Sequence, residues 1–165
     1  MSSNLRKFAT AATFALFAGA ATTATAQSHD GFYAGALIQN DFSVPYLDGA
    51  LGVFAGYNYG VSSGFVLGAE VEAQYDWATN VVPAGSAFTG LANVRAGYAL
   101  GNDFLLYGKV GAGVMTGAGF IYNYGIGGDL SVSDKYLLRG EIMRVSGTGM
   151  ARSRTDFKFG VGYQF

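Results

Sequence analysis

The chain has 165 residues, a length typical of a single domain. Half of the residues are hydrophobic, only 13% are charged and none is cysteine, which argues against intrinsic disorder and excludes disulfide frameworks, thiol nucleophiles and cysteine metal sites. The net charge of −1 argues against a nucleic-acid-binding protein, and 26 glycines beside 13 phenylalanines and 11 tyrosines indicate closely packed strands.

Residues 1–26 are predicted to be a cleavable signal peptide. A short positive region at 6–7 is followed by an apolar stretch at 8–21. The segment then ends in a small-x-small pattern, after which cleavage is predicted, directly following Ala26. The apolar stretch is shorter than the roughly 20 residues of a transmembrane helix, and the alternative is a buried amino-terminal helix. Cleavage would leave a mature domain of residues 27–165, exported across the inner membrane of a Gram-negative-type cell.

The mature region alternates with a period of two. Successive side chains of a strand point to opposite faces, so the wall of a membrane barrel should be apolar outside and polar or small inside. No later stretch of roughly 18 apolar residues offers a membrane helix, and a closed barrel is the only other structure that pairs every backbone group in lipid. Eight strands are predicted, at 31–40, 49–60, 64–77, 88–100, 103–115, 120–131, 135–146 and 154–165.

Short turns alternate with mostly longer connections between these strands. The turns are predicted at 60–63, 101–102 and 131–134, and the connections at 41–48, 78–87, 116–119 and 147–153. Outer-membrane barrels show this asymmetry, with both termini at the short-turn, periplasmic end. The fold predicted is therefore an all-β, eight-stranded antiparallel up-and-down transmembrane β-barrel.

A soluble barrel of lipocalin type would also alternate, but with its apolar residues pointing inward. Aromatic residues of the apolar face gather instead in two belts, as at two bilayer interfaces. The turn-end belt comprises Phe32, Tyr59, Phe65, Tyr98, Phe104, Tyr136 and Phe165, and the loop-end belt comprises Phe42, Tyr75, Trp77, Phe88, Tyr122 and Phe157. The polar face carries charges of both signs, which are Glu70, Glu72, Asp76, Asp129, Glu141 and Asp156 against Arg95, Lys109, Arg139 and Lys158. Both features favour the membrane.

Arg144 departs from this pattern, because its parity places it on the lipid face. Its position near the loop end would let the side chain extend to the headgroup level. Together with Arg152 and Arg154 across the same connection, it is a candidate contact for lipopolysaccharide phosphates, since arginine prefers planar bidentate anions. The alternative is that the three are solvated loop charges without a specific ligand.

The mature region resembles the small eight-stranded outer-membrane β-barrels, the group that contains the transmembrane domain of outer membrane protein A and the porin-like or opacity proteins of proteobacteria. The resemblance runs from Gly31-Phe32-Tyr33-Ala34-Gly35 to the ending Phe159-Gly160-Val161-Gly162-Tyr163-Gln164-Phe165. It implies that the barrel-assembly machinery recognises the terminal aromatic and the apolar residues at alternate positions before it. These residues are Phe159, Val161, Tyr163 and Phe165.

Catalysis is not expected. The sole histidine, His29, lies outside the predicted barrel wall, so no Ser-His-carboxylate set can form at the loop end. Glu70 and Glu72 share one strand face, and we expect them to pair with cations of the lumen rather than to act as a carboxylate pair. The glycine-rich stretches lack a following Gly-Lys-Ser/Thr, and candidate metal ligands are scattered carboxylates. No cofactor or metal is therefore expected.

Two functions remain open. The first is a porin-like passive permeability for ions and small solutes, and the alternative is a non-conducting structural or interaction barrel that supports envelope integrity or surface contacts. An eight-stranded barrel is only wide enough for its own side chains, which predicts a salt-bridged plug, whereas small inward residues at Gly35, Gly52 and Gly56 would permit a thin water path. We expect a monomer in the outer membrane, with both termini periplasmic and with outer-membrane lipids, lipopolysaccharide and the assembly machinery as partners.

Overall fold

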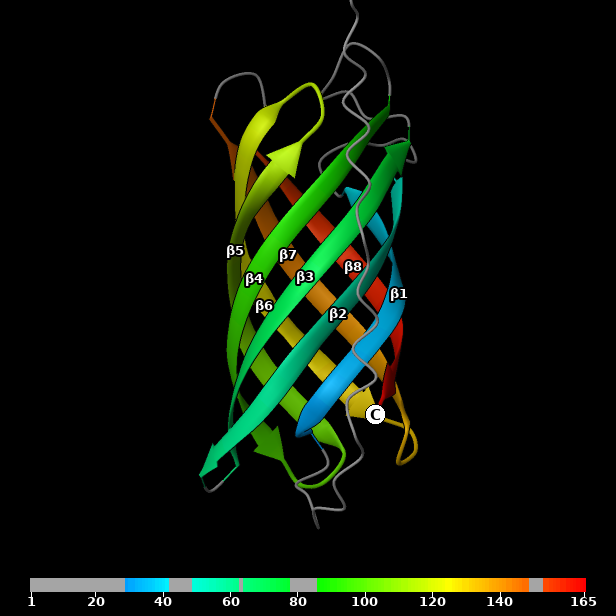
Figure 1. Cartoon of the computed structure of the whole chain (residues 1–165), viewed down its shortest axis with the longest axis vertical. Coiled ribbons are helices and arrows are strands. Elements are labelled where there is room, and N and C mark those ends of the chain that lie inside the picture. Colours follow the sequence, from blue (N-terminus) through cyan, green and yellow to red (C-terminus); the bar gives the residue numbers. More distant parts are fainter. Residues whose placement is uncertain (1–28, 42–48, 63, 78–85, 149–152) are drawn as a thin grey trace, which may run out of the picture.

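The alternating segments form strands that close on themselves into a barrel (Figure 1). The computed structural model describes residues 29–41, 49–62, 64–77, 86–148 and 153–165. Within these residues the strands are β1 (Gly31–Asp41), β2 (Gly49–Ser62), β3 (Phe65–Trp77), β4 (Ser86–Leu100), β5 (Phe104–Met115), β6 (Gly119–Ser131), β7 (Tyr136–Gly147) and β8 (Arg154–Gln164). Each strand pairs antiparallel with its neighbour in sequence, and β1 pairs with β8.

The predicted fold class is confirmed, and every strand boundary lies within two residues of its predicted position. The turn between β4 and β5 contains Gly101 with a φ of 73°, in the left-handed region that glycine tolerates best. Among the described residues, no helix is long and apolar enough to cross a membrane. The predicted signal peptide and two residues assigned above, Phe42 and Arg152, lie outside the described residues.

The two faces of the wall carry different side chains, as β3 shows most clearly. Val71 is 57% exposed on the outer surface, whereas Glu70 and Glu72 on either side of it are 3% and 4% exposed. The same alternation continues to the end of the strand, where Asp76 is buried and Trp77 is exposed. The apolar face therefore points outward and the charged face inward, which is the opposite of the lipocalin-type alternative.

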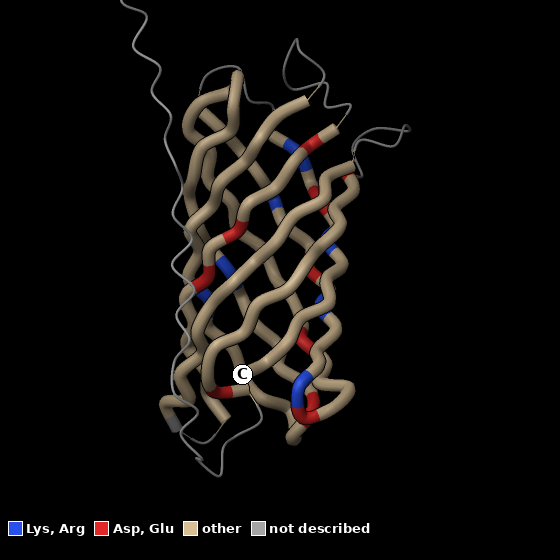
Figure 2. The backbone as a smooth tube through the Cα atoms, turned by 45° about the vertical axis from the view of Figure 1, so that its right-hand side comes forward, with Lys and Arg blue, Asp and Glu red and all other residues tan. Residues whose placement is uncertain are grey.

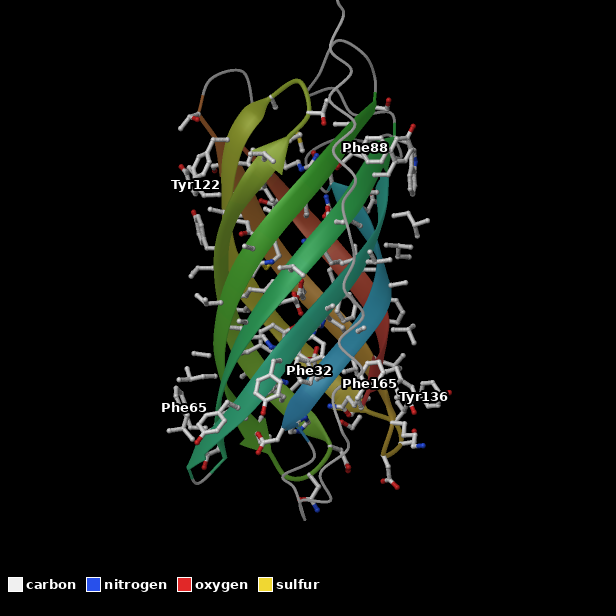
Figure 3. All side chains as sticks on the ribbon, in the orientation of Figure 1. Phe32, Phe65, Phe88, Tyr122, Tyr136 and Phe165 are labelled. Atoms are coloured by element: carbon white, nitrogen blue, oxygen red, sulfur yellow. The ribbon has the colours of Figure 1, made fainter. Side chains whose placement is uncertain are left out.

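Aromatic side chains mark both ends of the outer surface. Figure 3 shows Phe32, Phe65, Tyr136 and Phe165 at the turn end, and Phe88 and Tyr122 at the loop end. Of the twelve predicted belt residues that the structure describes, eleven are exposed and Phe104 is half-buried. The ring of Phe104 lies over Gly128 of β6, where an added Cβ would stand 2.7 Å from the ring.

Hydrogen bonds between β1 and β8 leave no open edge in the sheet. The two strands pair from Tyr33 with Gln164 to Asp41 with Asp156. Beyond the end of β8, the backbone N–H of Phe165 donates to the carbonyl oxygen of Phe32 at 2.9 Å. Such closure satisfies the backbone within the sheet, as a structure exposed to hydrocarbon requires.

Candidate functional site

The ten charged residues assigned to the polar face all lie inside the barrel, and none of them is more than 4% exposed. They come from six of the eight strands, β3 to β8, because each has the inward parity of its strand. Figure 2 shows both signs distributed along the barrel. Eight of them form what we call the central network, namely Glu70, Glu72, Asp129 and Glu141 with Arg95, Lys109, Arg139 and Lys158. Its four acidic and four basic groups balance in formal charge.

Lys109 of β5 lies where three carboxylates of the central network converge. Its Nζ atom donates to Oε1 of Glu72 at 2.6 Å, to Oε2 of Glu141 at 2.7 Å and to Oε1 of Glu70 at 3.1 Å. Because an ammonium group has three donors, these contacts use its full capacity. The carboxylates come from β3 and β7, neither of which neighbours β5, so this one side chain ties together opposite sides of the wall.

Arg139 of β7 holds Asp129 of β6, which is its direct partner in the strand register. Nε donates to Oδ1 at 2.7 Å and Nη2 donates to Oδ2 at 2.9 Å, a bidentate pair of the kind that arginine forms best. Nη1 bonds to Oε2 of Glu70 on β3. The guanidinium also lies 4.2 Å from the centroid of the Phe54 ring. One side chain thus spans the lumen while its flat face is covered by an aromatic ring.

Arg95 of β4 adds a second bridge to the same carboxylate. Its Nη1 donates to Oδ2 of Asp129 at 2.9 Å, and its Nε donates to Oδ1 of Asn58 at 2.9 Å. The guanidinium lies between the rings of Tyr33 and Tyr107, at 4.4 and 4.7 Å from their centroids. Cation–π contacts of this kind gain strength when both groups are removed from water.

Two tyrosine hydroxyl groups and one lysine complete the central network. Tyr33 donates to Oε2 of Glu70 at 2.8 Å, and Tyr107 donates to Oε1 of Glu141 at 2.7 Å. Lys158 of β8 donates to Oε2 of Glu72 at 2.6 Å. Each carboxylate is therefore bound by at least two donors, which satisfies the requirement that buried charges be paired.

A second group of charges, the loop-end cluster, centres on Arg154 of β8. Its Nη2 donates to Oδ1 of Asp76 at 2.9 Å, and its Nε donates to Oδ2 of Asp156 at 3.0 Å. Gln39 and Thr89 extend the cluster by donating to Asp156 and Asp76. The sequence interpretation placed Arg154 with Arg144 as a lipid contact, but the side chain lies inside and is 7% exposed. It shares the parity of Asp156, and that parity is the signal in the sequence that locates it.

Apolar side chains fill the lumen on both sides of the central network, although the sequence interpretation expected only polar or small residues there. At the loop end they belong to β4–β7 and the turn after β5, and are Ala87, Leu91, Met115, Ala118, Ile121 and Val145. Two further groups, partly in contact with the central network through Tyr33, Phe54 and Tyr107, are Tyr33, Leu37, Phe54 and Leu137, and Val66, Leu105 and Tyr107. These clusters occupy lumen space that the charged residues leave.

The small inward positions at Gly35, Gly52 and Gly56 are not open space, because neighbouring side chains lie where a Cβ would stand. An added Cβ at Gly35 would lie 2.5 Å from the Phe54 ring, and one at Gly52 would lie 2.8 Å from Cγ of Gln74. At Gly56 the ring of Tyr33 stands at 2.5 Å. These glycines accommodate large inward side chains, as glycines in strands commonly do.

His29 lies two residues before β1, outside the strands of the barrel wall, and its side chain is buried, with only 2% exposed. Burial lowers the pKa of the imidazole, and the nearby charge of Asp129 acts in the opposite direction. The nearby charge of Arg95 lowers the same pKa further, and those of Asp103 and Asp30 raise it. Within the part of the chain that the structure describes, no group of three His, Asp or Glu side chains could hold a metal ion.

The residues assigned to recognition by the assembly machinery lie on the outer surface of β8 and just beyond its end. Phe159 and Val161 are 44% and 49% exposed, and Phe165 is 78% exposed. Tyr163 is half-buried because its ring packs edge-on against Tyr136 and Phe165, at centroid distances of 5.5 and 5.1 Å. Arg144 is half-buried on the outer face of β7.

Comparison with known proteins agrees with this architecture. The structure is similar to a de novo designed transmembrane β-barrel (TM-score 0.56, 15% identity, covering 82% of this chain and 96% of that one). It is also similar to the amino-terminal β-barrel domain of Pseudomonas aeruginosa OprF (0.54, 14%, 83% and 98%) and to Yersinia pestis Ail (0.55, 12%, 82% and 100%). No curated protein matches the sequence. The family model of the outer membrane protein β-barrel domain matches residues 10–165, so the chain belongs to that family and is a protein of the outer membrane.

Proposed function

We propose that this protein is a non-conducting outer-membrane barrel, whose filled lumen stabilises the wall while its loops and outer surface make the contacts of the envelope. The observation that carries the proposal is the convergence of Glu70, Glu72 and Glu141 on Lys109 across the lumen, with all four side chains buried. Of the two functions left open by the sequence, this geometry favours the structural or interaction barrel over porin-like permeability. We place both termini in the periplasm and the loop end at the cell surface.

The cost of opening the lumen supports this choice. An ion could pass only after Lys109 or Arg139 left its partners, and separating one member of a buried ion pair costs roughly 3–5 kcal/mol. Since each 1.4 kcal/mol is about a factor of ten, an open state would be populated in roughly one molecule in a hundred to one in a few thousand. The apolar layers on both sides of the central network would then have to separate as well.

Ion flux from proteoliposomes tests the proposal. The full chain is refolded into potassium-loaded vesicles, and unboiled gel mobility verifies the closed barrel. Release of the trapped potassium ions is compared with release from protein-free vesicles. A potassium-selective carrier added to both kinds of vesicle gives the rate of complete release as a reference. We expect the wild-type protein to release potassium no faster than protein-free vesicles. A double variant, Lys109→Ser with Glu72→Ser, shortens two side chains that contact each other at the centre and should increase the rate at least tenfold. Fast release by the wild-type protein would contradict a closed lumen.

A further inference from the structure

We propose that Arg144 forms a binding site for a lipid phosphate group on the outer wall of the barrel. Among the described strand residues, Arg144 is the one charged side chain with outward parity, because every other Asp, Glu, Lys and Arg of the strands has the parity of the lumen. The wall around it is apolar, with Ile142 of the same strand 50% exposed. A lipid-facing charge is tolerated only near a bilayer interface, which is where the anionic groups of lipids lie.

The height of Arg144 on the barrel matches the level of lipid headgroups. Eight residues separate it from Tyr136 of the turn-end belt, and at about 3.3 Å per residue and a strand tilt of about 40° this separation corresponds to about 20 Å along the membrane normal. The apolar band of an outer-membrane barrel is about 25 Å tall. Tyr124 of β6 is the direct register partner of Arg144. Tyr122, at the loop end in Figure 3, is the next residue on the same face of β6 toward that end. The guanidinium can therefore reach the upper edge of the band.

The protein holds the guanidinium without neutralising it. Nη1 of Arg144 donates to Oγ1 of Thr155 at 2.9 Å, and Thr155 is its direct partner on β8. This contact involves one of the five N–H donors of the group and carries no charge. The next residue of β8, Asp156, points into the lumen, where Arg154 and Gln39 bind it. Among the described residues no carboxylate forms an ion pair with Arg144, so its positive charge is available to an anion from outside the wall.

A phosphate group fits this position best. The planar fork of an arginine binds phosphate oxygens in a bidentate manner, and partial burial beside an apolar wall strengthens the contact. Outer-leaflet phosphates belong to lipopolysaccharide or to a glycerophospholipid, and both offer the same chemistry. The structure removes Arg154 from the predicted set of three arginines, because its side chain is bound inside the barrel.

Lipid binding by the refolded full chain in phosphatidylcholine nanodiscs tests the site. Four probes are titrated, which are bisphosphorylated lipid A, dephosphorylated lipid A, phosphatidylglycerol and inorganic phosphate, and bound lipid is counted by native mass spectrometry. We expect Arg144→Gln to weaken binding of the phosphorylated lipids about tenfold and Arg144→Lys to weaken it less. Lys135→Gln removes a cation from the turn between β6 and β7 and should change nothing. Thr155→Val, which frees the guanidinium, should weaken binding about threefold.

The arms of the experiment separate the sources. Preference for bisphosphorylated lipid A assigns the site to lipopolysaccharide, and equal or stronger binding of phosphatidylglycerol assigns it to a glycerophospholipid. The proposal is overturned if dephosphorylated lipid A binds as well as the phosphorylated form, if inorganic phosphate saturates the site equally well, or if Arg144→Gln binds like the wild type. Because Arg144 faces outward, the variant should fold, and Thr155→Val provides an independent outcome if it does not.

Discussion

Replacement of Lys109 by methionine would test whether the central network stabilises the barrel. Methionine keeps most of the apolar stem but removes the ammonium group that donates to Glu70, Glu72 and Glu141. The formal charge of the central network would change from balanced to −1. Charge-assisted hydrogen bonds contribute about 1.5–3 kcal/mol each, so the three contacts set an upper bound of about 5–9 kcal/mol.

The expected loss is smaller than that bound, because each carboxylate retains another donor. Glu70 keeps Arg139 and Tyr33, Glu72 keeps Lys158, and Glu141 keeps the hydroxyl group of Tyr107. Removing one member of a buried ion pair costs roughly 3–5 kcal/mol, and the retained donors place the expected value at the lower end, about 3 kcal/mol.

Urea titration of the protein in phospholipid vesicles measures this loss, with fluorescence of Trp77, the single tryptophan, as the probe. Lys135→Met removes an exposed cation from a turn and should change the free energy of unfolding by less than about 0.5 kcal/mol. Adding Glu141→Gln to Lys109→Met restores the balance of charges and should recover about 1 kcal/mol. If Lys109→Met unfolds within about 0.5 kcal/mol of the wild type, the central network does not stabilise the barrel.

Three further changes probe the lipid face, the turn end and the packed lumen. Val71→Arg, at mid-height on the outer wall, should reduce the free energy of unfolding in bilayers by roughly 2–4 kcal/mol, whereas Ala73→Val on the same face should be tolerated. Equal stability of the two variants would show that the assignment of outward and inward residues is wrong. Because burial lowers the pKa of His29 in the folded state, its contribution to stability is fully present above pH 6.5 and is lost as the pH falls toward the folded pKa. The urea midpoint of the wild type should therefore fall between pH 7.5 and 5.5 more than that of His29→Gln, and parallel curves would contradict the buried imidazole. Gly52→Val would place side-chain atoms where Cγ of Gln74 lies 2.8 Å from an added Cβ, and should cost about 1–3 kcal/mol in the same titration, while an unchanged midpoint would indicate free space at this position.

The fold could be predicted from the sequence because lipid and lumen impose opposite demands on adjacent residues. The alternation of Glu70, Val71 and Glu72 already indicates which side chains of β3 point into the lumen. A shift of one residue in the strand register would reverse this assignment for the whole strand. Turn residues such as Gly101 then limit where each strand can end. The closeness of Asp129 and Arg139 also follows from local information, since the two residues are equally far along the chain from Asp134 in the turn between β6 and β7.

The pairing across the lumen could not be predicted in this way. Lys109 and Glu70 are 39 residues apart, and their contact depends on how the closed barrel staggers strands that do not pair with one another. Apolar inward residues such as Leu105 were missed because the lumen was expected to be polar, although their parity was readable. Arg154 was assigned by its nearness to Arg144 in sequence, whereas its parity with Asp156 describes its actual position.

Single-channel recording of the wild-type protein in a planar bilayer tests the closed lumen most directly. The buried central network and the apolar layers on either side of it predict a silent barrel at moderate voltage, in a preparation whose unboiled gel mobility confirms folding. Glu70→Gln, which removes one charge from the contacts with Lys109 and Arg139, should produce brief openings at most. Steady conductance of the wild type, with an amplitude or ion selectivity that Glu70→Gln changes, would contradict the account and establish a charged pore.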